Sequence, residues 1–239
     1  MTARQYHLTP DNKKRLIEGL KAAISVPMID SIEDFVWESI FCYMKNIALV
    51  DPFNNIRSKR LYDITDRDNQ IGWSAKALQW SLKASCEFEI VIQRANIFNK
   101  AKELGFARLD LDSDPNEIGK ALLKHWHKKV NDDALAQNVI DKRICILLKN
   151  KKCDKFSFIE EEITLYDADE LIWQWTDDKK IGLKGIRKSD NFCVYKWYHN
   201  QKQFFERFKF SENPWIFTIN QQRFNICDFV SLINSHLDK

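Results

Sequence analysis

An acid and a lysine lie in two neighbouring strands that the pattern of residues 60–79 predicts around a polar turn. The acid is Asp63, and the lysine closes the triplet Ser74-Ala75-Lys76 of the second strand. Hydrolysis of a phosphodiester is served by a Mg²⁺ ion, held by oxygen ligands, that stabilises charge at phosphorus and orients a water molecule. A nearby lysine helps to position or deprotonate that water. These residue types therefore predict a metal-dependent phosphodiesterase.

The predicted strands bring these side chains together only in one register. Residues 61–65 alternate between apolar and polar types, residues 66–69 are the turn cluster Asp-Arg-Asp-Asn, and a second strand returns over residues 71–78. If the strands pair as a hairpin, Asp63 falls opposite Ser74. Residues i and i+2 of a strand share a face, so Lys76 points the same way. A slip of one residue would separate the three side chains.

This arrangement resembles the PD-(D/E)xK nuclease superfamily, best represented by type II restriction endonucleases. In that family an acid near the end of one strand is followed, on the next strand, by an acid-x-lysine. Asp63 matches the first acid, Lys76 matches the lysine, and the backbone carbonyl of Ala75 matches the middle position, which commonly contacts the metal. Ser74 departs from the pattern, because the family usually has Glu, Asp or Gln there. The resemblance covers about residues 30–95.

The resemblance implies a fold, a reaction and a partner. The fold is α/β or α+β, with a mixed central β-sheet flanked by helices in a restriction-endonuclease-like core and a β-rich C-terminal part. The reaction is site-specific cleavage of double-stranded DNA with Mg²⁺, in which Asp63 binds the metal and Lys76 assists the water. Such enzymes often act as homodimers, because a palindromic site mirrors a two-fold axis.

A second carboxylate is missing from the matched positions, and two residues are candidates for it. Many members of the superfamily carry an extra glutamate on a helix before the core strands, and Glu38 lies within a helix predicted over residues 31–47. A buried carboxylate is costly unless it is paired or binds a metal, but Glu38 on the solvent face needs no such partner. Asp66 is the other candidate, although its place in the turn explains it already.

The pair formed by Asp63 and Lys76 also has a plain structural interpretation. A cross-strand ion pair on a solvated sheet face is common and contributes only a few tenths of a kcal/mol. In that case the chain is a non-catalytic nucleic-acid-binding or protein-interaction module, and Ser74 in place of an acid favours this alternative. The acids Glu160-Glu161-Glu162 are interpreted as a solvated edge.

Charge is distributed unevenly along a chain whose net charge is only +3. Residues 160–178 hold eight acids and no Lys or Arg, whereas residues 179–209 hold nine Lys or Arg against two acids and are interleaved with aromatic residues. Such a stretch favours an anionic partner. The predicted DNA contacts are Arg57, Lys59, Arg60, Gln93, Arg94, Lys184, Arg187 and Lys188.

Composition excludes several other classes of protein. Of the 239 residues, 44% are hydrophobic and 30% are charged, as in ordinary globular proteins, and the apolar runs are too short for a membrane span. The first residues lack the apolar core of a signal peptide, and the six Cys show no CxxC spacing, so we expect reduced thiols, a cytoplasmic location and no membrane partner. Phosphate-binding glycine loops are also missing.

The coarse pattern alternates helices and strands. Helices are expected over residues 11–25, capped by Thr9, and over 31–47, 95–104, 115–129 and 228–237; strands are expected over 61–65, 71–78, 87–94, 143–148, 156–164, 171–175, 192–198 and 215–220. We expect residues 87–94 to lie beside Lys76 as a third strand. The prediction is one nuclease-like domain, with helices and the catalytic core in residues 1–150 and a β-rich DNA-binding part, a candidate subdomain, in residues 151–239.

Overall fold

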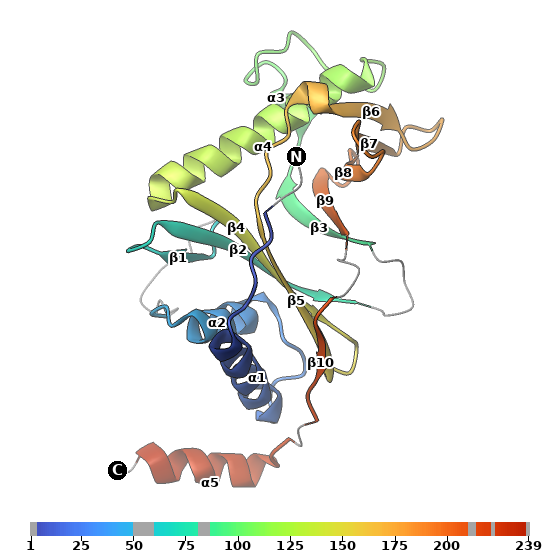
Figure 1. Ribbon diagram of the computed structural model, residues 1–239. Coiled ribbons are helices and arrows are strands. Elements are labelled where there is room, and N and C mark those ends of the chain that lie inside the picture. The colour runs from blue at the N-terminus through green and yellow to red at the C-terminus, as the bar shows by residue number, and fades with distance from the viewer. Residues whose placement is uncertain (1–3, 50–59, 81–86, 210–213, 221–222, 238–239) are drawn as a thin grey trace. The chain divides into compact units, whose positions relative to one another are not determined.

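The chain folds into two compact units that are interleaved along the sequence. The computed structural model describes residues 4–49, 60–80, 87–209, 214–220 and 223–237. Unit 1 takes residues 1–83, 134–163 and 214–239, and unit 2 takes residues 84–133 and 164–213. Each unit is built on one five-stranded sheet (Figure 1). The mixed α and β content is confirmed, but neither unit coincides with residues 1–150 or with residues 151–239.

Unit 1 contains a mixed sheet with the strand order β1-β2-β4-β5-β10. Only β2 and β4 pair in parallel; the other neighbours pair antiparallel. The strands of unit 1 are β1 (Ile64–Asp66), β2 (Ile71–Gln79), β4 (Asp141–Lys149), β5 (Lys155–Glu162) and β10 (Ile216–Thr218), and its helices are α1 (Pro10–Ser25), α2 (Asp34–Lys45) and α5 (Ile226–Leu237).

The two helices that begin the chain form for local reasons that the sequence shows. Thr9 accepts the backbone N–H of Asn12 at 3.1 Å as the predicted cap of α1, and Pro10 occupies the first helical position. The second helix, α2, begins at Asp34 and not at residue 31. The ammonium of the buried Lys149 holds the preceding loop by donating to the hydroxyl of Ser31 at 2.6 Å and to the carbonyl of Ile32. The oxygens of residues 31 and 32 therefore bind the buried ammonium of Lys149, and the loop that carries them is not part of the helix.

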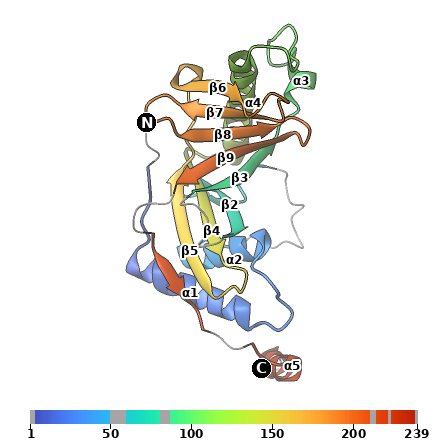
Figure 2. The same ribbon diagram turned by 90° about the vertical axis from the view of Figure 1, so that its right-hand side faces the viewer.

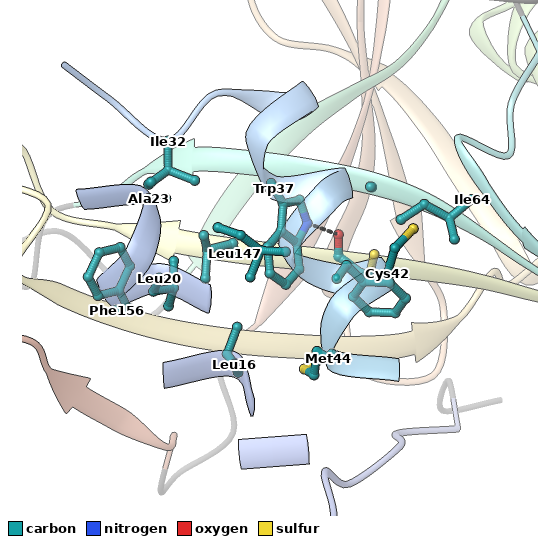
Figure 3. Close-up of a cluster of buried hydrophobic side chains, with 14 of the residues drawn as sticks. Leu16, Leu20, Ala23, Ile32, Trp37, Cys42, Met44, Ile64, Leu147 and Phe156 are labelled. Atoms are coloured by element: carbon teal, nitrogen blue, oxygen red, sulfur yellow. Dashed lines mark hydrogen bonds between the residues drawn. The ribbon is translucent and has the colours of Figure 1, made fainter. Parts of the chain in front are cut away.

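The core of unit 1 lies between these helices and one face of the sheet. Leu16, Leu20 and Trp37 pack with Leu147 and Phe156, all of them buried (Figure 3). The indole N–H of Trp37 donates to the carbonyl of Cys145 at 3.3 Å, drawn as a dashed line in Figure 3. Since an indole N–H in a core needs an acceptor, this bond fixes where α2 lies along β4.

Unit 2 contains an antiparallel sheet with the strand order β3-β9-β8-β7-β6, whose strands lie side by side in Figure 2. Its strands are β3 (Glu87–Arg94), β6 (Leu171–Trp175), β7 (Gly182–Arg187), β8 (Cys193–Tyr198) and β9 (Gln203–Lys209); its helical segments are α3 (Ile97–Lys100), α4 (Pro115–Gln137), whose last four residues belong to unit 1, and the 3₁₀ turn η1 (Ala168–Glu170). Trp173 of β6 packs on Gly119 of α4, where a methyl group would meet its ring at 2.3 Å.

The expected place of β3 beside Lys76 is wrong. β3 pairs with β9 in unit 2, and the strand that follows β2 in the sheet of unit 1 is β4. Two ion pairs accompany this pairing, because Glu89 binds Lys196 at 2.9 Å and Glu87 binds Arg207 at 2.7 Å in the basic strands of unit 2. The apolar run of β4 instead suits a buried strand with a parallel neighbour.

Candidate metal-binding site at the edge of strand β2

The edge of β2 beyond its short partner β1 is closed by two carboxylates. The described pairing of β1 with β2 covers only Ile64 to Asp66, so the backbone N–H groups of Ala75 and Ala77 have no strand acceptor on that side. The carboxylate of Asp63 accepts the N–H of Ala75 at 2.9 Å, and that of Asp34 accepts the N–H of Ala77 at 2.8 Å. Two acids from different elements therefore meet one strand edge.

The carbonyl of Ala75 lies between these two N–H groups. In an extended strand the N–H and C=O of one residue point to the same edge, and the pattern repeats every second residue, about 7 Å further on. We call the Asp63 carboxylate, the Ala75 carbonyl and the Asp34 carboxylate the oxygen row. Lys76 Nζ donates to the Ala75 carbonyl at 2.9 Å and to Asp63 Oδ2 at 3.3 Å. Part of the oxygen row thus already binds a cation.

The oxygen row is accessible to solutes. The side chains of Asp63 and Lys76 retain 26% and 25% of their exposure, whereas Ser74 is buried. The register supports the predicted alignment, since the pairing of Ile64 with Trp73 puts Asp63 opposite Ser74 when it is continued by one residue. The structure therefore brings together Asp63, Ala75 and Lys76. It leaves the hydroxyl of Ser74 in the interior, where it adds no exposed ligand.

The two candidates for the missing carboxylate have other surroundings. Glu38 is half-buried in α2 beside the Cys42 thiol, whose pKa rises to about 11, chiefly through burial and secondarily through this charge. Asp66 accepts hydrogen bonds from the side chain of Asn69 and from the backbone N–H groups of Asp68 and Asn69, and these bonds lower its pKa. Asp66 therefore closes its own turn, and the role of Glu38 stays a prediction.

Asp34 is the acid that the sequence interpretation missed. It lies in the first turn of α2, where a negative charge is favourable near the helix N-terminus. Its carboxylate reaches β2 because α2 begins at this residue and because Trp37, one turn later, fixes the helix over β4. The sequence feature that could have identified Asp34 as a site residue is an acid at the start of the helix that precedes the hairpin.

A second acidic cluster in unit 1 is structural. Glu160 is buried and accepts the indole N–H of Trp73 at 2.8 Å, Arg143 Nη1 at 3.0 Å and Lys45 Nζ at 2.7 Å. Its charge is thus balanced by two cations, as a buried carboxylate requires. Glu161 is also buried, and burial raises its pKa. The interpretation of these acids as a solvated edge is therefore wrong for two of the three.

The predicted DNA contacts divide into three groups. Arg57 and Lys59 lie outside the described residues. Of the six that are described, three are exposed: Arg60, Arg94 and Lys188. The other three are half-buried: Gln93, Lys184 and Arg187. Arg187 is held in place, since its guanidinium makes two bonds to Asp190, at 2.9 and 2.7 Å, and one to the Tyr166 hydroxyl at 2.7 Å. These bonds close the turn between β7 and β8 and use three of the five N–H donors of the Arg187 guanidinium.

Within the described ranges, no group of three or more His, Cys, Asp or Glu side chains is placed to hold a metal ion. The oxygen row has two carboxylates and one carbonyl, which suits an ion that keeps several of its waters, as Mg²⁺ does. No helix of the described part of the chain is long and apolar enough to cross a membrane. Comparison with family models, curated proteins and solved structures finds no match to this chain.

Proposed function

We propose that the protein is a Mg²⁺-dependent, site-specific endonuclease of double-stranded DNA, of the type II restriction class. The observation that supports this proposal is the oxygen row, with the ammonium of Lys76 bound to two of its members. Asp63, Asp34 and the carbonyl of Ala75 would hold the ion, and Glu38 remains a further candidate. When bound, Mg²⁺ supplies charge stabilisation at phosphorus and orients the attacking water.

The residues of the chain account for the remaining parts of the reaction. Lys76 is within reach of the same oxygens, so its amine is placed to orient or deprotonate water beside the phosphate. The exposed Arg60 precedes Asp63, and the basic strands of unit 2 provide further cations for the DNA backbone. As part of the proposal the enzyme acts as a homodimer in the cytoplasm, where its five described cysteines, all free, remain reduced.

Cleavage of unmodified plasmid and phage DNA, with Mg²⁺ or with EDTA, tests the proposal. We expect discrete fragments only with Mg²⁺, and a loss of at least 100-fold for Asp63→Asn and for Lys76→Ala, since each removes a group that acts in the transition state. Lys76 and the ion compete for the same oxygens, so Lys76→Ala should bind Mg²⁺ at least as tightly as the wild type while cutting poorly.

The matched control is another acid and lysine pair, Asp132 and Lys128, which bind at 2.7 Å on the surface of α4. Asp132→Asn and Lys128→Ala should cut as the wild type does. A smear with Mg²⁺ would mean a nuclease without site preference. Intact cleavage in Asp63→Asn would refute the assignment of the site.

A non-catalytic nucleic-acid-binding or protein-interaction module is the second candidate. The burial of Ser74 favours it, because the acid of the acid-x-lysine pattern is missing and nothing exposed replaces it at that position. Such a module should show no cleavage of several unmodified DNAs and no Mg²⁺ binding that depends on Asp63. DNA binding that weakens steeply with salt would then separate a nucleic-acid binder from a protein scaffold.

A further inference from the structure

The last helix of unit 1, α5, leaves its apolar side chains uncovered. None of its residues is buried, and Ile226, Val230, Ile233 and Leu237 are between 42% and 76% exposed. In both views no other element of unit 1 lies along it (Figure 1, Figure 2). Scattered exposed apolar residues are ordinary, but four large ones on a single helix face mark an interaction surface.

The start of α5 is anchored, although the helix itself is not. The backbone N–H of Phe224 donates to the carbonyl of Ser25 at 3.1 Å, and Arg223 binds Asp30 at 3.4 Å. Asn225 then caps the helix by accepting the backbone N–H of Asp228 at 2.9 Å. The segment just before the helix is therefore fixed near the end of α1, and the helix begins at a side-chain cap.

The spacing of the exposed residues is that of a helix pair. Ile226, Val230, Ile233 and Leu237 follow one another at intervals of four, three and four residues, which places them in one seam of the coiled-coil type. The opposite face carries Asp228, Ser231 and Ser235. The apolar face therefore needs a second apolar helix, and the polar face is compatible with water.

The seam is complementary to itself. When two copies of α5 run antiparallel about a two-fold axis, Ile226 of one copy faces Leu237 of the other, and Val230 faces Ile233. Because the intervals read the same in both directions, all four residues find apolar partners, as an isologous contact requires. Asp228, the one acid of the helix, lies on the far face, so like charges do not meet.

The composition of α5 favours a second copy over other partners. The residues of α5 include no Lys or Arg, which a helix that lies on an anionic membrane surface or on DNA would carry. The exposed apolar set also includes Phe224 and Leu232. Phe224 precedes the helix and Leu232 lies toward its far face, because an α-helix turns about 100° per residue, so the proposed contact is made by the four seam residues.

We propose that α5 is a homodimerisation element, in which two copies of the chain pair their α5 helices antiparallel through the seam formed by Ile226, Val230, Ile233 and Leu237. This assignment rests on the helix alone and does not depend on the proposed nuclease activity.

Sedimentation equilibrium of the full chain tests the proposal. We expect a mass of twice 28.4 kDa for the wild type and a monomer for Val230→Asp/Ile233→Asp, because two buried charges per helix disrupt the seam. Ser231→Asp adds a charge to the far face of the same helix and should remain dimeric. No residue of α5 is buried within the chain, so both variants should retain the fold of unit 1, as measured by circular dichroism.

Cross-linking distinguishes the orientation of the helices. In a Cys227→Ser background, Val230→Cys/Ile233→Cys should form a covalent dimer on mild oxidation, while either cysteine alone should do so poorly, since antiparallel pairing places residue 230 opposite residue 233. Efficient cross-linking of the single variants would indicate a parallel pair and overturn the proposed geometry. A monomeric wild type, a dimer that survives Val230→Asp/Ile233→Asp, or flotation of a monomer with phosphatidylserine vesicles would overturn the proposal itself.

Discussion

At the scale of single residues, Asp34 is the side chain whose role the structure makes testable. Asp34→Asn retains an oxygen acceptor for the N–H of Ala77 but loses the charge, whereas Asp34→Ala loses both. If Asp34 is a metal ligand, both variants should cut DNA at least 100-fold more slowly, and excess Mg²⁺ should restore part of the activity of Asp34→Asn. Only Asp34→Ala should also lose about 1 kcal/mol of folding stability, measured by urea unfolding.

The comparison of the two variants separates the two roles of this carboxylate. Wild-type cleavage by Asp34→Asn would mean that Asp34 only closes the edge of β2. A large loss of stability in Asp34→Asn, with cleavage reduced in proportion, would mean that the charge itself holds α2 in place and that the metal assignment is wrong.

His127 gives unit 2 a pH dependence whose sign follows from its burial. The half-buried ring accepts no hydrogen bond at Nε2 from any described residue, and burial lowers its pKa below the usual 6.5. Just below about pH 6.5, the unfolded chain binds a proton at His127 and the folded chain does not. The free energy of unfolding is therefore greatest above that pH and falls as the pH drops toward the folded-state pKa. The neighbouring His125 has its pKa lowered chiefly by burial as well.

Urea unfolding at about pH 7.5 and about pH 5.5 measures this effect, because few other side chains titrate in that window. The wild type should lose stability at the lower pH, and His125→Gln/His127→Gln should lose less. His7→Gln, which changes an exposed histidine, is the control and should behave as the wild type. An unchanged pH dependence in the double variant would contradict the assignment.

At the scale of elements, the contact between α4 and β6 depends on the absence of a side chain at Gly119. A methyl group there would meet the ring of Trp173 at 2.3 Å, and Trp173 is also bounded by Gly185, where a methyl group would meet the ring at 2.8 Å. Alanine favours a helix over glycine by about 1 kcal/mol, but overpacking of a core typically costs about 1–3 kcal/mol. We expect Gly119→Ala to destabilise the protein in spite of its better helix propensity.

The measurement is the midpoint of thermal or urea unfolding, with Lys124→Ala on the exposed surface of α4 as the control. That variant improves helix propensity without a new contact in the core and should be neutral or stabilising. If Gly119→Ala were stabilising, the close packing of Trp173 on α4 would be wrong.

The elements that could be predicted from sequence are those with local causes. The Thr9 cap, Pro10 and the apolar spacing of the first helix define α1, and the Asp66 turn together with alternation predicts the hairpin, in which Ile64 pairs with Trp73. The partner of β3 could not be predicted, because the strand it pairs with and the residues that bind its acids lie more than 100 positions away. The burial of Glu160 depends likewise on Lys45, Trp73 and Arg143, which lie in three different elements.

The strands β7 and β9 were missed for a related reason. Both lie in the basic stretch, where charge suggested a surface that binds an anion and obscured the alternation of buried and exposed residues. In β9, Phe204, Glu206 and Phe208 are buried while the residues between them are not. Two of the basic residues, Lys196 and Arg207, pair with acids of β3, so part of the positive charge of this stretch holds the sheet of unit 2 together.

At the scale of the whole molecule, the proposed chemistry and the proposed DNA contacts belong to different units. The oxygen row and Lys76 lie in unit 1, while Lys184 and Lys188 lie in unit 2. Neither lysine forms an ion pair with a described side chain, in contrast to Arg187 and Lys196. The cationic groups of unit 2 that remain for a phosphate backbone thus belong to a different unit from the groups proposed to act on the scissile bond.

This separation predicts that binding and cleavage respond to different substitutions. Each phosphate contact contributes about 0.9 to the slope of log K against log salt concentration, so Lys184→Ala/Lys188→Ala should weaken DNA binding and reduce that slope by about 2, with the cleavage rate at saturating DNA unchanged. Lys76→Ala should slow cleavage at saturating DNA and leave the affinity for DNA and its salt dependence unchanged. Lys128→Ala, a lysine on α4 that pairs with Asp132, should change neither quantity. A double variant that binds DNA with wild-type affinity and salt slope but cuts slowly would contradict this division, because its lysines would then act at the scissile phosphate and not along the DNA backbone.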